Sequence, residues 1–158
     1  MTRNRDKIVR VVLLGLVVGL SAGGCAKGQG AMTSPHEAQQ AAIRLLEESE
    51  RQADLAWPTT PSPSAERCES GVRFGYYVPV QVETDTKQLA ETFQRFWESK
   101  GLTVSPSKTD FGQRRGILYS ATADKEGAPS AAYQISDTTV VIRVVSQCAE
   151  GSLDDYEQ

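Results

Sequence analysis

Apolar and polar residues alternate at the start of the aromatic-rich second half of the chain. The apolar positions are Val72, Phe74, Tyr76, Val78, Val80 and Val82, and the residues between them are Arg73, Gly75, Tyr77, Pro79 and Gln81. A period of two residues is typical of a strand with one buried face. Because proline has no amide hydrogen, Pro79 favours an edge position or a bulge in this strand.

The pattern then changes to helical spacing. Leu89, Phe93, Phe96 and Trp97 form an apolar stripe, with a capping sequence before it at 84–86. Apolar residues three and four positions apart lie on one face of a helix. Gly101 follows as a residue suited to the position just beyond a helix C-terminus. We expect a helix that buries this aromatic stripe.

Four further strands are predicted, over residues 102–104, 115–123, 131–135 and 138–145. Residues 106–112 are predicted to be a loop. Because short turns join consecutive strands, these strands form an antiparallel meander. The first strand is expected to pair with the last. The fold class is therefore α+β: a two-layer sandwich in which an antiparallel sheet of about five strands (β-α-β-β-β-β) carries helices on one face.

A second helix is predicted ahead of this core, over residues 34–57. Ser34, Pro35 and Glu37 form a helix start with a capping box. We expect the helix to run from Pro35 to about Ala56. Residues 58–66 contain three prolines and are predicted to be a linker. The core domain is then expected over residues 67–149, followed by an acidic C-terminal tail over 150–158.

The N-terminal 24 residues have the pattern of an export signal. A basic segment is followed by the apolar run VVLLGLVVGL and then by small residues. This order is typical of a secretory signal peptide. The apolar run is too short for a membrane-spanning helix, which needs about 20 residues. Residues 25–33 are small and polar, and they predict a flexible tether.

The small residues 21–24 end on Cys25, and this arrangement resembles the lipobox of bacterial lipoproteins. The resemblance implies that the Cys25 sulfur receives a diacylglyceryl group. Cleavage would then make Cys25 the first residue of a chain held on the extracytoplasmic face of the cell membrane. Two alternatives stay open: a secreted protein in which Cys25 has no role, and a protein with a transmembrane anchor.

The layout of the remaining chain is similar to that of small uncharacterised lipoproteins of actinobacteria. The similarity covers the tether, the helix and a domain bracketed by two cysteines. It is carried most clearly by residues 89–104, LAETFQRFWESKGLTV, an aromatic-rich helix that runs through a glycine into a strand. This family implies no particular biochemical activity.

Cysteine usage predicts one disulfide. If Cys25 is lipidated, Cys68 and Cys148 remain as a pair in an oxidising compartment. Their bond would close a loop of about 80 residues and stabilise the fold by about 3–4.5 kcal/mol on the chain-entropy model. The pairing of the first and last strands would bring the two residues to the same end of the sheet. Two free buried thiols are the alternative.

Charge and composition exclude several functional classes. The formal net charge is −3, and removal of residues 1–24, which carry +3, makes it −6. An acidic chain without a basic stripe is not expected to bind nucleic acid. With one histidine and three cysteines, we expect no metal site and no cofactor.

No set of residues predicts catalysis. His36 lies at the start of an exposed helix. The tripeptide 110–112 spells the metal-binding motif of protein kinases, but no other kinase motif is present. Arg114 and Arg115 are expected to be a solvated pair. A loop carboxylate pair, Asp110 with Asp124 or Glu126, is the one enzymatic alternative, and it would make the protein a small cell-envelope hydrolase.

The favoured hypothesis is a non-enzymatic binding or accessory module, anchored by lipid outside the membrane. Its partner would be a protein, a cell-wall component or a small molecule. Because helices are expected on one face of the sheet only, the other face is the candidate contact surface, and it carries Arg73, Tyr77 and Gln81. The buried aromatic residues could fill the core or line a ligand cleft, and the sequence leaves both readings open.

Overall fold

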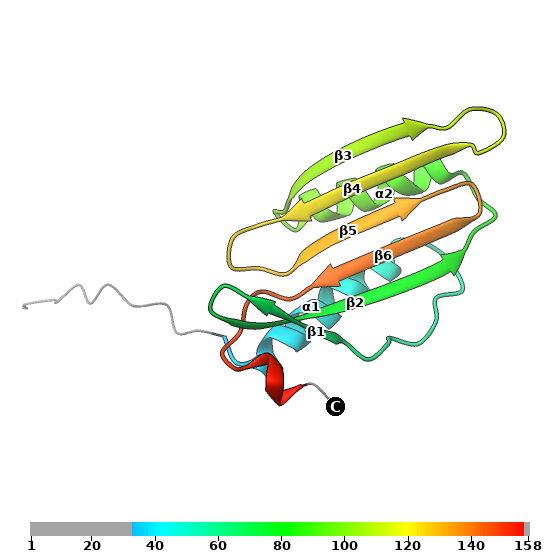
Figure 1. Cartoon of the computed structure of the whole chain (residues 1–158). Helices are drawn as coiled ribbons and strands as arrows, with labels where there is room; N and C mark the ends of the chain where they lie inside the picture. Colours follow the sequence, from blue (N-terminus) through cyan, green and yellow to red (C-terminus); the bar gives the residue numbers. More distant parts are fainter. Residues whose placement is uncertain (1–32, 157–158) are drawn as a thin grey trace, which may run out of the picture. The chain divides into compact units, whose positions relative to one another are not determined.

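The computed structural model describes residues 33–156. These residues form a six-stranded antiparallel sheet with two helices packed on one face (Figure 1). In chain order the elements are α1 (Pro35–Glu50), β1 (Ser64–Cys68), β2 (Gly71–Gln81), α2 (Thr86–Ser99), β3 (Thr103–Asp110), β4 (Ile117–Asp124), β5 (Ser130–Ile135), β6 (Thr139–Val145) and the short 3₁₀ helix η1 (Leu153–Asp155). The predicted α+β class is confirmed.

The strand order across the sheet is β1-β2-β6-β5-β4-β3. The last four strands form the predicted antiparallel meander, and β2 pairs with β6 as expected. The β2–β6 register runs from Gly75↔Val145 to Gln81↔Thr139. This pairing joins the two ends of the core sequence at the centre of the sheet. The other sheet face carries no helix.

The sheet has one strand more than predicted, because β1 lies inside the segment predicted to be a linker. Residues Ser64–Cys68 pair with Gly71–Gly75 in an antiparallel hairpin. The sequence SAERC has no apolar alternation, so nothing in it predicts a strand. Ladder hydrogen bonds to β2 hold this segment, and they depend on backbone groups that every sequence offers.

The predicted loop over residues 106–112 is also wrong, since β3 continues to Asp110. This strand is exposed along nearly its whole length and lies at the edge of the sheet. An edge strand buries little surface, which explains why its sequence lacks an apolar period. Pro106 interrupts its outer row of donors and so hinders pairing with another chain.

Pro79 occupies an edge-like position, as its missing amide predicts. It lies opposite Val141 of β6, beyond the last β1 pair at Ser64↔Gly75. That half of β2 has β6 as its only neighbouring strand. Because no strand lies on the other side of Pro79, its missing amide costs no ladder hydrogen bond there. Both open edges of the sheet therefore carry a proline.

Helix α1 begins as predicted and ends earlier than predicted. The Ser34 hydroxyl accepts a hydrogen bond from the Glu37 amide, and the Glu37 carboxylate accepts one from the Ser34 amide. The helix ends at Glu50 instead of about Ala56. There the indole N–H of Trp57 donates to the Glu50 carbonyl at 2.8 Å. Trp57 thus adds a side-chain donor to the Glu50 carbonyl, which also accepts from the Ala53 amide beyond the helix end.

The two helices pack through one buried hydrogen-bond chain. Trp97 of α2 is completely buried, and its indole N–H donates to the hydroxyl of Ser49 at 2.9 Å. The Ser49 hydroxyl in turn donates to the Leu45 carbonyl at 2.7 Å. Ser49, which interrupts the apolar face of α1, is therefore the partner that a buried tryptophan requires. Helix α1 and the sheet share one core.

An aromatic cluster fills the space between α2 and the sheet. The Trp97 ring stacks on Phe93 at 6.1 Å and on Tyr133 of β5 at 5.5 Å between centroids. Phe93 and Tyr133 lie 6.0 Å apart, and all three rings are almost fully buried. Tyr76 is buried as well, and Phe96 and Tyr119 are partly buried against the core. Most of these aromatic residues fill the core, and Tyr119 also lines a groove between α2 and the β3–β4 edge.

The C-terminal segment packs on the domain as far as Tyr156. Its ring lies edge-on to Phe74 of β2 with 5.0 Å between centroids. Leu153 of η1 is partly buried against the core. The acidic tail predicted from composition therefore includes apolar residues that anchor it.

We predict that Ser49→Ala will lower the free energy of unfolding by about 1–3 kcal/mol, because it leaves the Trp97 N–H buried without an acceptor. Urea unfolding followed by tryptophan fluorescence measures this loss. Ser99→Ala is the matched control, since its hydroxyl also donates within a helix, to Phe96, but is exposed. Equal losses in the two variants would contradict the assigned role of Ser49.

Candidate binding surface

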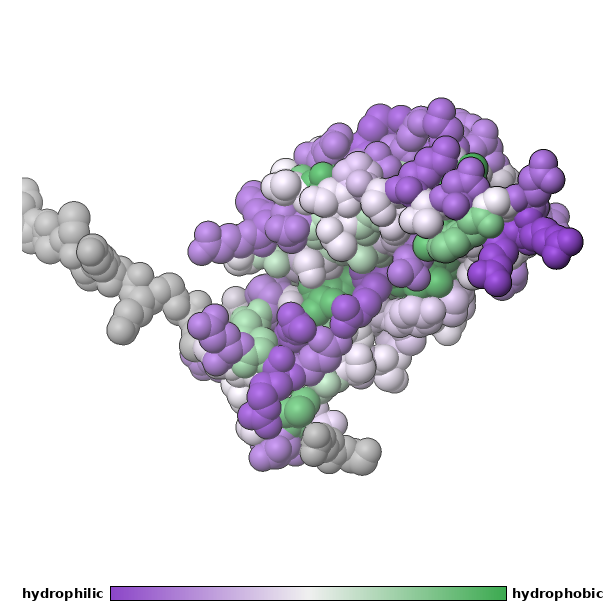
Figure 2. All heavy atoms as spheres, turned by 45° about the horizontal axis from the view of Figure 1, so that its top comes forward, coloured by the Kyte–Doolittle hydropathy of each residue, from purple (hydrophilic) through white to green (hydrophobic). Residues whose placement is uncertain are grey.

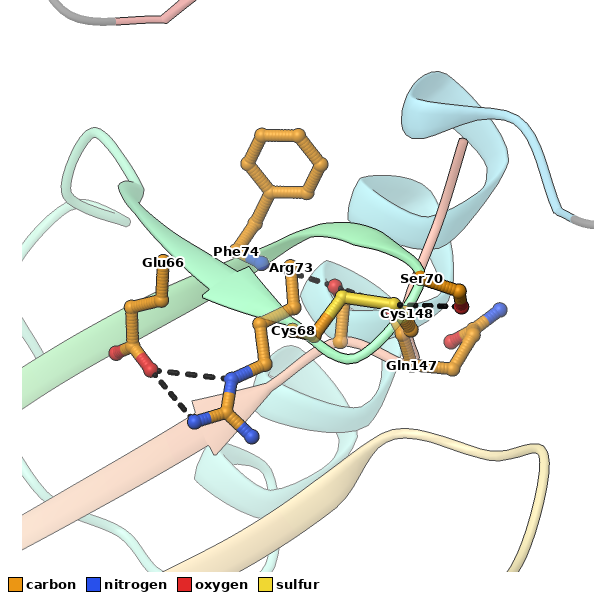
Figure 3. Close-up of a disulfide and its surroundings, with 8 residues drawn as sticks. Glu66, Cys68, Ser70, Arg73, Phe74, Gln147 and Cys148 are labelled. Carbon is orange, nitrogen blue, oxygen red and sulfur yellow. Dashed lines mark hydrogen bonds and ion pairs between the residues drawn. A yellow bond between two sulfur atoms is a disulfide. The ribbon is translucent and has the colours of Figure 1, made fainter. Parts of the chain in front are cut away.

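The structure joins Cys68 and Cys148 by a disulfide, as the cysteine count predicts (Figure 3). Their Cα atoms are 6.0 Å apart, and the Ser70 hydroxyl lies 3.5 Å from the Cys148 sulfur. Cys68 ends β1 and Cys148 follows β6, so the bond fastens the edge hairpin to the centre of the sheet. The two cysteines are 80 residues apart in the sequence, so the bond closes a long loop.

The first described residue, Thr33, lies at this same end of the sheet. Its carbonyl accepts a hydrogen bond from the Glu150 amide at 3.1 Å, and it forms a parallel bridge with Ala149. Ala149 also exchanges two hydrogen bonds with Val72 of β2. The chain therefore enters the domain beside the disulfide.

The helix-free face of the sheet, which we call the open face, carries the three residues predicted for contact. Arg73, Tyr77 and Gln81 alternate with buried residues along β2 and are exposed. The side chain of Tyr77 is 58% exposed, the largest value for any large apolar residue among those described. Strand alternation places all three on one face, and whether a partner touches them stays a prediction.

An ionic cluster forms on the open face that the sequence did not predict. The Glu66 carboxylate of β1 accepts hydrogen bonds from Nε of Arg73 at 3.2 Å and from Nη2 of Arg143 at 2.5 Å. All three side chains are partly exposed. Solvent screens such pairs, so each contributes little to stability. The cluster holds two guanidinium groups close together with one carboxylate between them.

Gly75 makes this arrangement possible. A Cβ atom on Gly75 would lie 3.0 Å from the Glu66 carboxylate and 3.2 Å from the Ser64 hydroxyl. Without a side chain there, Glu66 can reach across β2 to Arg143 of β6. The alternating pattern of β2 includes Gly75, but it does not show that the Glu66 side chain fills the space that glycine leaves.

Arg143 and Glu66 were missed for different reasons. Arg143 alternates with Ile142 and Val144, so its outward direction was visible in the sequence. Its position opposite Tyr77 follows only from the β2–β6 register. Glu66 lies in β1, which was predicted to be a linker. No signal in the sequence connects it to either arginine.

The structure separates the carboxylates of the enzymatic alternative. Asp124 lies opposite Thr103 at one end of the β3–β4 pair, and Asp110 lies opposite Ile117 at the other end. Seven residues along a strand correspond to about 23 Å, whereas paired carboxylates in glycoside hydrolysis lie about 5–9.5 Å apart. Glu126 follows Asp124 in the β4–β5 turn. This pairing is therefore wrong, and Asp110 instead caps a turn by accepting from the Gly112 amide.

The other singled-out residues are dispersed. His36 is exposed in the first turn of α1, and Arg114 and Arg115 are exposed in the β3–β4 turn. Phe111 of the kinase-like tripeptide is 51% exposed at that turn. Strand directions place the turn at the end of the sheet away from the disulfide. These residues form no common site.

Hollows in the described part of the molecule are shallow. One groove of about 300 Å³ runs between α2 and the β3–β4 edge, with Gln94 and Tyr119 in its wall. Another of about 390 Å³ lies beside the disulfide and includes Thr33, Arg73 and Gln147. Within residues 33–156, no three potential ligand side chains converge on a metal position. No helix among them is long and apolar enough to cross a membrane.

The fold and the surface together define a small α+β domain with one open sheet face and a disulfide at one end. No protein-family model, no curated protein and no solved structure matches the chain. Its function must therefore be argued from its own residues.

One partly buried carboxyl predicts a pH dependence of stability. Desolvation on burial, together with the charge of Glu47, raises the pKa of Glu50, and one of its oxygens has no hydrogen-bond partner in the described structure. A carboxyl whose pKa is raised in the folded state stabilises that state while it is protonated. This contribution is fully present below the unfolded pKa and is lost as the pH rises through the folded pKa.

We therefore predict that Glu50→Gln raises the unfolding free energy more at pH 7 than at pH 4. Urea unfolding at both pH values measures the difference between variant and wild type. Glu98→Gln removes one carboxylate from an exposed position of α2 and serves as the control. An advantage of Glu50→Gln that is the same at both pH values would rule out this account of Glu50.

Proposed function

We propose that this protein is a lipid-anchored binding module on the extracytoplasmic face of the cell membrane, and that it acts without catalysis. The observation that carries the proposal is the open face, on which Tyr77 is exposed opposite Arg143 and on the same side of the sheet as Arg73. A sheet face that no helix covers is available to a partner. Tyrosine and arginine are the residue types most often found at the energetic centres of binding surfaces.

The anchoring half of the proposal rests on the N-terminal sequence. A basic segment, a short apolar run and small residues before Cys25 are the pattern of a lipoprotein signal. Two acyl chains would hold the protein stably, since each buried CH₂ contributes about 0.8 kcal/mol. The Cys68–Cys148 disulfide agrees with an oxidising compartment.

The entry point of the chain lies at the disulfide end of the domain. Thr33 lies eight positions after Cys25 in the sequence, which gives a maximum reach of about 29 Å. Because Thr33 is fixed beside the disulfide, that end of the domain would face the membrane. The strands of the open face would then extend away from the lipid surface, where a partner in the envelope can reach them.

Partners that add a strand to the sheet fit this domain poorly. Strand addition needs a row of free amide and carbonyl groups at an edge. Pro106 interrupts that row on β3, and Pro79 interrupts it on the open half of β2. We therefore assign binding to the open face and not to the edges of the sheet.

We predict that Cys25→Ala releases the protein from the membrane, because the variant lacks the sulfur that would carry the diacylglyceryl group. Fractionation of cells with immunodetection, together with labelling by a fatty-acid analogue, measures this release. Cys68→Ala with Cys148→Ala is the control, and it should keep both the label and the membrane location. Retention of the Cys25→Ala protein in the membrane fraction would contradict the lipid anchor.

The binding half of the proposal is tested by site-specific crosslinking in the native host. A benzophenone amino acid at position 77 should capture envelope material from the open face. The same group at position 111, an exposed aromatic position at the far turn, is the matched control. Equal capture at positions 77 and 111, or capture at neither, would rule out the open face as the binding surface.

A further inference from the structure

Two rows of side chains cross five strands of the open face. Opposed residues in a ladder share a face of the sheet, so the registers assign each row. The first row is Tyr77, Arg143, Ala132, Thr122 and Ser105, and the second is Pro79, Val141, Gln134, Ser120 and Ser107. At about 4.8 Å between strands, each row is about 19 Å long.

The far part of these rows is polar and uncharged. Strands β3 and β4 contribute only hydroxyl side chains to the rows, and the Ser107 and Ser120 hydroxyls lie 2.9 Å apart. A hydroxyl both donates and accepts, and the Gln134 amide offers both functions as well. Sugar hydroxyls have this same dual character, whereas a carboxylate only accepts and an ammonium group only donates.

The near part of the rows is aromatic and cationic. Tyr77 stands directly opposite Arg143, with its ring 58% exposed. Arg73 lies two residues before Gly75 and shares Glu66 with Arg143. Two guanidinium groups against one carboxylate give this cluster a net charge of +1 on a chain whose formal charge is −3. An anionic group is the charge-complementary ligand for this cluster.

The open face has no broad apolar area. Figure 2, which is turned from Figure 1 so that the β3 side comes forward, shows mostly pale and purple surface with small, separate green areas. The centre of a protein–protein contact is apolar and aromatic. Attachment to a lipid surface needs an inserted apolar face or a cluster of basic residues. Neither is present among the residues of the two rows.

We propose that the open face binds an acidic polysaccharide that lies across the strands. A sugar ring packs on Tyr77, and a carboxylate or phosphate substituent pairs with Arg143 and Arg73. Hydroxyls of the following sugars bond to Gln134, Thr122 and the serines of β3 and β4. The span of about 19 Å corresponds to a short run of sugars. This inference rests on the proposed binding role and names its ligand class.

The test is a titration of the full chain, purified from membranes in detergent, with a hyaluronan hexasaccharide. This probe carries a carboxylate on every second sugar. We expect saturable binding by calorimetry. A neutral hexasaccharide of N-acetylglucosamine should bind at least tenfold more weakly, and so should poly-glutamate, which has charge without sugar. Binding of poly-glutamate equal to that of hyaluronan would overturn the polysaccharide assignment.

Variants locate the site. Tyr77→Ala and Arg143→Gln should each weaken hyaluronan binding at least tenfold, and Thr122→Val should weaken it several-fold by removal of one hydroxyl. Phe111→Ala and Arg114→Gln remove the same residue classes at the far turn and should leave the affinity unchanged. Equal losses in the two sets would overturn the proposal. Thermal unfolding confirms that each variant is folded.

The two proposals can fail separately. If hyaluronan does not bind while crosslinking at position 77 captures a protein, the binding module stands and the polysaccharide is wrong. If hyaluronan binds but the crosslinker at position 77 captures no more than the one at position 111, the assignment of the open face is wrong. If the chain neither binds hyaluronan nor is captured from position 77, both proposals are wrong.

Discussion

The antiparallel pairing of β2 with β6 is the interaction on which the rest of the structure depends. It joins segments that begin more than 60 residues apart and places them at the centre of the sheet. Its register directs the even-numbered residues of both strands, such as Val78 and Ile142, toward the helices. The odd-numbered residues, Tyr77 and Arg143 among them, are directed to the open face. A shift of one residue would exchange the two faces and bury a guanidinium group. The same pairing brings the residues that flank it, Cys68 and Cys148, within reach of each other.

The layer beneath the sheet combines buried aliphatic side chains with an aromatic cluster between α2 and the sheet. Phe93, Trp97 and Tyr133 contact one another, and the Trp97 N–H finds its acceptor on the other helix, at Ser49. This hydrogen bond joins α1 and α2, because a buried indole N–H requires an acceptor. The disulfide ties the end of β1 to the segment that follows β6. Strand β1 buries little surface, so it gains little stability from packing. Packing of the core thus stabilises the centre of the sheet, and the disulfide stabilises its β1 edge.

The open face differs from both the core and the sheet edges in what it offers to a ligand. The edges carry prolines that hinder the addition of a strand. The open face carries the exposed ring of Tyr77, two guanidinium groups and several serine and threonine hydroxyls. Such a surface suits a ligand with many hydroxyls and a negative charge better than it suits an apolar one. An anchor at the disulfide end would leave this face accessible along its length. The proposed location and the proposed ligand class are in this way compatible, although they rest on different residues.

The α+β class, the strand over residues 72–82, the helix with the Phe93 stripe and the pairing of Cys68 with Cys148 were predictable from the sequence, because each follows from a local period or from a count. The sequence also placed Arg73, Tyr77 and Gln81 on one face, since alternation along a strand needs no knowledge of its neighbours. Tertiary structure alone decided that residues 64–68 and 106–110 are strands, because edge strands are held by backbone hydrogen bonds and not by an apolar pattern. It alone placed Arg143 opposite Tyr77, brought Glu66 to Arg143 and moved Asp110 away from Asp124, since distances between strands depend on register, which a local pattern does not contain.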